Sequence, residues 1–151
     1  MNEEIRTLID SLRRGQYEDP GEKIDLLSAA LREHRADVAL LLSLLRAPQI
    51  PLRLAAVEAC RGQTEQELVL ELLKLAEDTE ARVRKKLAAI LEGFDSKPVQ
   101  EAVRTLAQDS DEEVRQAAVK SSAGKPAFIE LRKSTTRVDR VFKGHLEALL
   151  G

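Results

Sequence analysis

A chain of 151 residues is most simply one domain, and a domain of this size buries about 70 % of the surface that its unfolded chain exposes. Its 43 % hydrophobic and 33 % charged residues suit a water-soluble helical protein, whereas only 3 % aromatic residues argue against base-stacking nucleic-acid binders and aromatic-rich interfaces. The net charge of −2 argues against a chain that is adapted as a whole to phosphate backbones.

The first 35 residues predict an amphipathic pair of helices. Apolar residues recur at helical spacing on both sides of the loop GQYEDP. They are Ile5, Leu8, Ile9 and Leu12 before the loop, and Ile24, Leu27 and Leu31 after it. We expect residues 1–35 to cap a longer helical array, because one side of an end unit meets water.

Residues 36–124 contain three copies of one pattern. Gly62, Gly93 and Gly124 are spaced by 31 residues, and they end the segments LRLAAVEACRG, VRKKLAAILEG and VRQAAVKSSAG. The arginines near the start of these segments keep the same spacing: Arg53, Arg84 and Arg115. A fixed period of this length is the signature of stacked helical hairpins, none of which can bury its apolar face alone. We therefore define three core repeats, 36–62, 63–93 and 94–124.

Each repeat predicts two antiparallel helices. In the first repeat, Asp37 caps the segment VALLLSLLRA, and Pro48 and Pro51 shape the turn and start the second helix. In the other two repeats, apolar residues mark the buried stripes. These residues are Leu68, Leu72, Leu73, Leu75, Val83, Leu87, Ile90 and Leu91 in the second repeat, and Val99, Val103 and Leu106 in the third.

The later helices carry start and stop signals of their own. Thr64 with Glu67, and Ser110 with Glu113, have the spacing of capping boxes. Pro98 suits the first position of a helix. The pattern also predicts that Gly93 ends its helix in the left-handed conformation.

Residues 125–151 predict a last helical pair that caps the array. Pro126 opens a short helix, and residues 141–151 follow the repeat template with Phe142 where the other repeats carry arginine. The whole chain thus predicts an all-α fold, an alpha-alpha superhelix of about five helical hairpins, with no strand and no long linker.

The repeat pattern resembles a known family. Its clearest copies, EDTEARVRKKLAAILEG and QDSDEEVRQAAVKSSAG, are similar to the short HEAT-like repeats first described in phycobilin lyases, which also occur in bacterial scaffold proteins. The resemblance implies an α-solenoid, in which the second helices line a concave, partner-binding surface. It also implies that a turn aspartate and a helix arginine contact each other or neighbouring repeats, and Asp78 and Asp109 each lie six residues before such an arginine. In the first repeat Ala47 takes that position, so we expect proline stiffness to hold its turn.

The ladder of Arg53, Arg84 and Arg115 has two possible roles. Three guanidinium groups in a row could bind an anion. The structural alternative is that each arginine binds turn carbonyls and an aspartate within its own repeat, because its planar fork of donors fits such acceptors. The recurrence of the arginine in every core repeat favours the structural role.

A partner surface is predicted on the second helices, at the positions that the apolar stripes use least. We expect the contact residues to be Leu54, Glu58, Lys85, Lys86, Gln116 and Lys120. This surface has a basic centre and an acidic rim, and it could hold an acidic peptide or helix. The alternative is that these charges are simply solvated.

The C-terminal segment is basic, with six Lys and Arg residues against three acidic residues in positions 125–151. It could contact nucleic acid, an acidic protein or anionic lipid, but a surplus of three charges supports only a weak, salt-sensitive contact. A solvated cap is the simpler interpretation.

Catalytic chemistry finds no support in the sequence. His34 and His145 lie in opposite end units, so they do not form a metal-binding pair, and Cys60 falls on a buried stripe. No phosphate-binding loop, nucleophile elbow or Cys-x-x-Cys pair occurs. We expect no cofactor and no metal.

Together these patterns predict a non-catalytic protein-binding scaffold in the cytoplasm. The single cysteine, the absence of a signal peptide and the absence of a long apolar run support that location. We expect a monomer, although Phe142, Leu146 and Leu149 could support a weak dimer. The alternatives are a chromophore-lyase-like enzyme or subunit, which rests on the family resemblance alone, and a weak nucleic-acid binder through the basic C-terminal segment.

Overall fold

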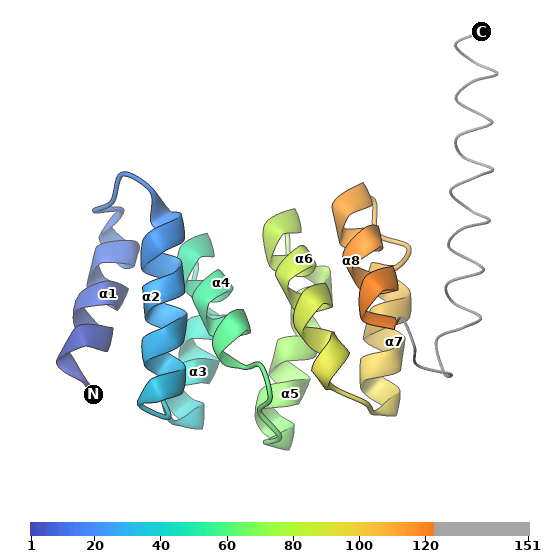
Figure 1. Ribbon diagram of the computed structural model, residues 1–151, viewed down its shortest axis with the longest axis horizontal. Helices are drawn as coiled ribbons and strands as arrows, with labels where there is room; N and C mark the ends of the chain where they lie inside the picture. The colour runs from blue at the N-terminus through green and yellow to red at the C-terminus, as the bar shows by residue number, and fades with distance from the viewer. Residues whose placement is uncertain (123–151) are drawn as a thin grey trace, which may run out of the picture.

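The fold is described by a computed structural model over residues 1–122, which contain eight α-helices and two short 3₁₀ segments (Figure 1). The α-helices are α1 (Glu3–Arg14), α2 (Pro20–Glu33), α3 (Val38–Leu45), α4 (Ile50–Ala59), α5 (Gln66–Leu73), α6 (Ala81–Ile90), α7 (Lys97–Leu106) and α8 (Glu112–Ser122). The 3₁₀ segments are η1 (Lys74–Glu77) and η2 (Leu91–Gly93). The predicted C-terminal helical pair and Gly124 lie outside the described residues.

The helices form sequential antiparallel pairs that stack side by side. Each second helix packs against the second helix of the next pair, so that α2, α4, α6 and α8 form one row (Figure 1). The first helices α3, α5 and α7 form the other row, and α1 packs on α2 and α4. The helices that carry the repeated arginines, α4, α6 and α8, are therefore neighbours, as the 31-residue period predicts. Over residues 1–122 the predicted all-α fold is confirmed as four hairpins.

The core runs continuously between the two rows. Most predicted stripe residues are buried: Leu68, Leu72, Val83, Leu87, Ile90 and Leu91 in the second repeat, and Val99, Val103 and Leu106 in the third. The prediction is wrong for Leu73 and Leu75, which are only partly buried against the core. Small residues let α4 and α6 approach their neighbours, because Ala55, Ala56 and Ala88 are also completely buried. The hydroxyl of buried Ser121 on α8 donates a hydrogen bond to the Ala88 carbonyl on α6, which satisfies its polar group and joins two repeats.

At the start of α1, α2 and α3, a short polar side chain accepts hydrogen bonds from free backbone N–H groups of the first turn. The predicted cap at Asp37 is confirmed, because its Oδ1 accepts a hydrogen bond from the Leu40 N–H at 2.8 Å. The predicted cap at Thr64 is wrong: α5 begins one residue later, with Glu65 as its N-cap and no side-chain hydrogen bond. The cap predicted at Ser110 is wrong as well. Asp111 takes that role, and its Oδ1 accepts from the Val114 N–H at 3.1 Å.

The two glycines at the ends of the repeats adopt different conformations. Gly62 has a φ of 82°, so it makes the left-handed stop that favours glycine. The same prediction is wrong for Gly93, which has no positive φ. It continues the right-handed turn as the last residue of η2, which extends α6 by a tighter helical turn.

None of the helices in residues 1–122 is both long enough and apolar enough to cross a membrane.

Candidate functional site: the second-helix surface and the arginine–aspartate staples

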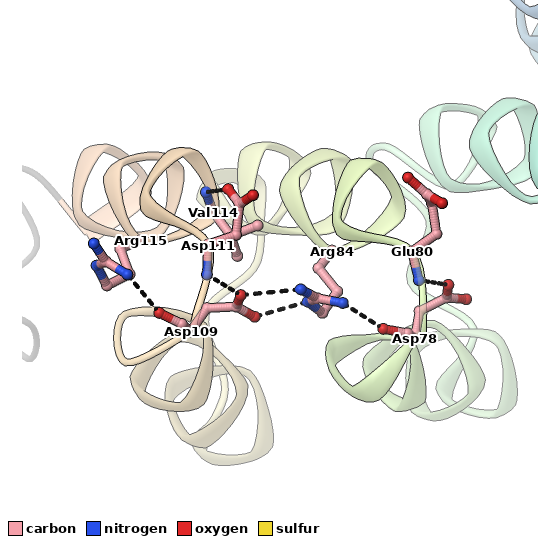
Figure 2. Close-up of polar contacts among 7 residues, drawn as sticks. All are labelled: Asp78, Glu80, Arg84, Asp109, Asp111, Val114 and Arg115. Carbon is pink, nitrogen blue, oxygen red and sulfur yellow. Dashed lines mark hydrogen bonds and ion pairs between the residues drawn. The ribbon is translucent and has the colours of Figure 1, made fainter.

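The repeated arginine of α6 joins three segments of two repeats (Figure 2). Arg84 Nε and Nη2 donate to the two carboxylate oxygens of Asp109 at 2.8 and 3.1 Å, while Nη1 donates to the Asp78 carbonyl at 2.7 Å. Asp109 lies before α8, in the next repeat, whereas Asp78 lies in the turn before α6 itself. The planar guanidinium group thus binds its own turn and the following repeat together. We call this arrangement an arginine–aspartate staple.

A second staple with the same geometry joins the first and second core repeats. Arg53 Nε and Nη2 donate to Asp78 at 2.9 and 3.1 Å, and Nη1 donates to the carbonyls of Ala47 and Pro48. For Arg84 the pairing with an aspartate of its own repeat is therefore wrong, and the pairing with a neighbouring repeat, which the family resemblance also implies, is the one that forms. Within the repeat, the acceptor is a backbone carbonyl. The turn of the first repeat is also held by Arg53, and not by proline stiffness alone.

The aspartates of the staples also order the turns in which they lie. Asp78 Oδ1 accepts from the Glu80 N–H and Asp109 Oδ1 accepts from the Asp111 N–H, both at 2.9 Å (Figure 2). The Asp109 carbonyl in turn accepts from Arg115 Nη1 at 2.8 Å. Each aspartate therefore closes its turn with one oxygen while it binds the arginine of the preceding repeat.

The staples do not present Arg53 and Arg84 to a soluble anion. Their side chains are only 12 % and 15 % exposed, and Nε, Nη1 and Nη2 of both already donate to protein oxygens. The hydrogen bonds to Asp109 raise the pKa of Arg84 above its ordinary value. For these two arginines the structure supports the structural role.

The predicted contact residues lie on α4, α6 and α8, and most of them face solvent. Lys85, Gln116 and Lys120 are exposed, while Glu58 and Lys86 are partly buried. Leu54 differs from the expectation that it is loosely tied to the core, because it is only 8 % exposed and belongs to the core cluster. It nevertheless lines a hollow together with residues of α6 and of the start of α8. We call these three helices' solvent-facing side the second-helix surface.

Ion pairs cross the second-helix surface from helix to helix. Glu58 on α4 lies 3.1 Å from Arg61 and 3.8 Å from Lys86 on α6, and Lys85 on α6 lies 3.6 Å from Glu113 on α8. Exposed pairs of this kind are worth about 0–1 kcal/mol each. They therefore leave these side chains able to exchange partners at little cost.

Two hollows adjoin one another on this surface, one toward the start of α6 and the other toward its end. One, of about 390 Å³, lies over Leu54, Ala81 and Lys86. The other, of about 450 Å³, lies over Arg61, Ala117 and Lys120. Both are lined by Lys85, Ala89 and Glu113, so they form one continuous depression along α6.

An acidic side chain of the other row was not anticipated from the sequence. Glu71 on α5 accepts hydrogen bonds from Arg46 Nε at 2.7 Å and Lys74 Nζ at 2.9 Å, and its side chain is 14 % exposed. The hydrogen bond from Arg46, with that from Lys74, lowers the pKa of Glu71 from 4.5 to about 2. The sequence carries only a weak signal for this ion pair, because Arg46 and Glu71 do not occupy positions that recur in the other repeats.

Because the folded pKa of Glu71 lies below its unfolded value, its ion pairs stabilise the fold above pH 4.5, and this contribution is lost as the pH falls toward about 2. We expect Glu71→Gln to lower the free energy of unfolding by roughly 1 kcal/mol at pH 7. The difference from the wild type should shrink through that window and vanish only below about pH 2. Urea unfolding at several pH values measures it. Glu101→Gln, at an exposed position of α7, is the control and should change nothing.

Cys60 is fully buried at the end of α4, as its position on the apolar stripe predicts. Burial raises the pKa of its thiol to about 12, so the reactive thiolate is scarce at neutral pH. We expect a thiol reagent such as dithionitrobenzoate to leave the native protein unmodified at pH 8 and to label one thiol per chain in guanidinium chloride. Rapid labelling of the native protein would show that Cys60 is accessible.

The described part of the chain contains no group of three or more His, Cys, Asp and Glu side chains that could hold a metal ion. His34 lies 3.9 Å from Glu4 at the N-terminal end of the stack, and His145 lies outside the described residues.

Stacked helical hairpins with a 31-residue period, a shared core and polar staples between equivalent positions define an α-helical repeat protein. Residues 38–123 match the family described as HEAT repeats, and this match covers more than half of the chain. The protein therefore belongs to the HEAT repeat family. Comparisons with curated proteins and with solved structures gave no match, and the resemblance to the phycobilin-lyase type of repeat stays a prediction.

Proposed function

We propose that this protein is a non-catalytic scaffold that binds a protein partner on the second-helix surface. The observation that carries the proposal is the continuous depression along α6, which is lined by exposed side chains of three neighbouring repeats. Membership of the HEAT repeat family supports it, because the rows of helices in repeat proteins form extended binding surfaces. A cytoplasmic location, inferred from the sequence, belongs to the same proposal.

The staples give this surface a mechanism for binding. Arg53 and Arg84 fix α4, α6 and α8 relative to one another through bidentate contacts, and the short turns between helices are closed by Asp78 and Asp109. A surface that is already ordered loses little conformational entropy when a partner binds. The proposed contact residues Leu54, Glu58, Lys85, Lys86, Gln116 and Lys120 would then meet the partner without rearrangement of the backbone.

Site-specific photocrosslinking in the producing cell tests the proposal. A photoreactive amino acid at Ala89, which is exposed and lines both hollows, should give discrete crosslinked protein bands. The same amino acid at Glu101, on the exposed side of α7, is the matched control and should give none. Equal labelling from both positions, or no band from Ala89, would contradict a partner on the second-helix surface.

A further inference from the structure

We infer that the occupant of the second-helix surface is an acidic protein segment that carries an aliphatic side chain. This inference rests on the proposed function and specifies the chemistry of the partner. It follows from two features of the depression along α6, its charge and its small apolar side chains.

More cations than acids line the two hollows themselves, five against three. The cations are Arg61, Arg82, Lys85, Lys86 and Lys120, and the acids are Glu92, Asp111 and Glu113. Arg61 and Lys86 pair with Glu58, and Arg82 pairs with Glu80, so Lys85 and Lys120 are the cations that remain available to a partner. Complementary charge attracts an acidic partner and suppresses a basic one.

Two of these cations are available to a partner at little cost. Lys85 is 50 % exposed and lies 3.6 Å from Glu113, which is itself 72 % exposed, so its ion pair is weak. Lys120 is exposed on the far side of the same hollow. A carboxylate between these two ammonium groups would replace solvent and one weak ion pair.

Small apolar side chains line part of the depression. Ala81, Ala89 and Leu54 line one hollow, and Ala117 lines the neighbouring one. Alanines leave room above the helix backbone, and a hollow of about 390 Å³ can accept an aliphatic side chain. Burial of that side chain would supply the hydrophobic part of the binding.

The same features disfavour a nucleic acid. No aromatic side chain lines either hollow, so bases would have no stacking platform.

Selection of peptides from a displayed library of random 16-residue sequences, with the full chain as the target, tests the inference. We expect the enriched peptides to be rich in Asp and Glu around one or two Leu, Ile or Val residues. Their affinity should fall at least tenfold in the double variant Lys85→Glu/Lys120→Glu, and it should weaken as the salt concentration rises. The matched control is Lys97→Glu/Arg104→Glu, which reverses two exposed charges on α7 and should leave the affinity unchanged.

The variant Ala89→Trp separates failure of this inference from failure of the proposed function, because it places a bulky ring at an exposed position that lines both hollows. If the enriched peptides are neutral or basic and bind the wild type but not Ala89→Trp, the inference of an acidic partner is wrong, while the proposed binding surface stands. Peptides that bind Ala89→Trp as well as the wild type, or a selection without enrichment, would overturn both. If a labelled single-stranded oligonucleotide binds the wild type but not Ala89→Trp, the partner is a nucleic acid and not an acidic protein segment.

Discussion

Replacement of Asp109 by alanine is expected to lower the free energy of unfolding by about 3 kcal/mol. The change leaves the Arg84 guanidinium, 15 % exposed, without its two carboxylate acceptors, and it also removes the acceptor of the Asp111 N–H. A charge left unpaired at a largely buried site costs more than the pair itself contributes. In a chain of this length the loss corresponds to a fall in Tm of roughly 6–12 °C, which differential scanning calorimetry measures.

Glu101→Ala is the control for this experiment. It removes a carboxylate from the exposed side of α7, in the same repeat as Asp109, and should change the unfolding free energy by less than about 0.5 kcal/mol. If Asp109→Ala also costs less than about 1 kcal/mol, the staple does not hold the repeats together.

The second large effect is expected in the centre of the core. Leu87 on α6 is completely buried, and Leu87→Ala should lower the free energy of unfolding by about 3 kcal/mol, because it removes apolar contacts and leaves a cavity. α6 lies between α4 and α8 in the row of second helices, so the cavity would form in the middle of the stack. Urea unfolding followed by circular dichroism measures the loss.

Leu70→Ala is the matched control, because it makes the same chemical change at an exposed position. Leu70 on α5 is 47 % exposed, so the same chemical change should cost well under 1 kcal/mol. Similar losses in both variants would mean that the buried stripe of α6 does not lie in the core that the structure shows.

The fold was predictable because three independent signals agree over residues 36–122. The 31-residue spacing gives the repeat, the apolar stripes give two helices in each repeat, and Asp37 and Pro51 mark helix starts. The local details were less predictable. A capping box is a short pattern with many chance matches, and both Thr64 and Ser110 fell next to a neighbouring residue that takes the N-cap position. Gly93 showed that a glycine at a repeat's end need not be left-handed.

The staples illustrate why periodic sequences are ambiguous. In a strict repeat, an aspartate six residues before each arginine also lies 25 residues after the preceding arginine, so sequence spacing alone cannot distinguish the two pairings. The first core repeat distinguishes the two pairings. Arg53 has Ala47 six residues before it but Asp78 25 residues after it, and Asp78 is the residue whose carboxylate it binds. The sequence therefore held the signal, and its interpretation as proline stiffness missed it.

The second-helix surface could be predicted only in outline. Helical periodicity separated exposed Lys85, Gln116 and Lys120 from the buried stripe. It did not reveal that Leu54 is buried and lines a hollow, because burial there depends on how closely α6 approaches α4. Nor could it show the ion pair between Lys86 and Glu58, which joins two helices far apart in sequence.

A double-mutant cycle on Arg84 and Asp109 tests most directly whether staples between repeats fix the second-helix surface. The cycle uses Arg84→Ala, Asp109→Ala and the double variant, and a parallel cycle replaces Asp109→Ala with Asp78→Ala. We predict a coupling free energy of about 2 kcal/mol between Arg84 and Asp109, and below about 0.5 kcal/mol between Arg84 and Asp78, whose contact with Arg84 is through the backbone carbonyl. A larger coupling to Asp78 than to Asp109 would contradict the account.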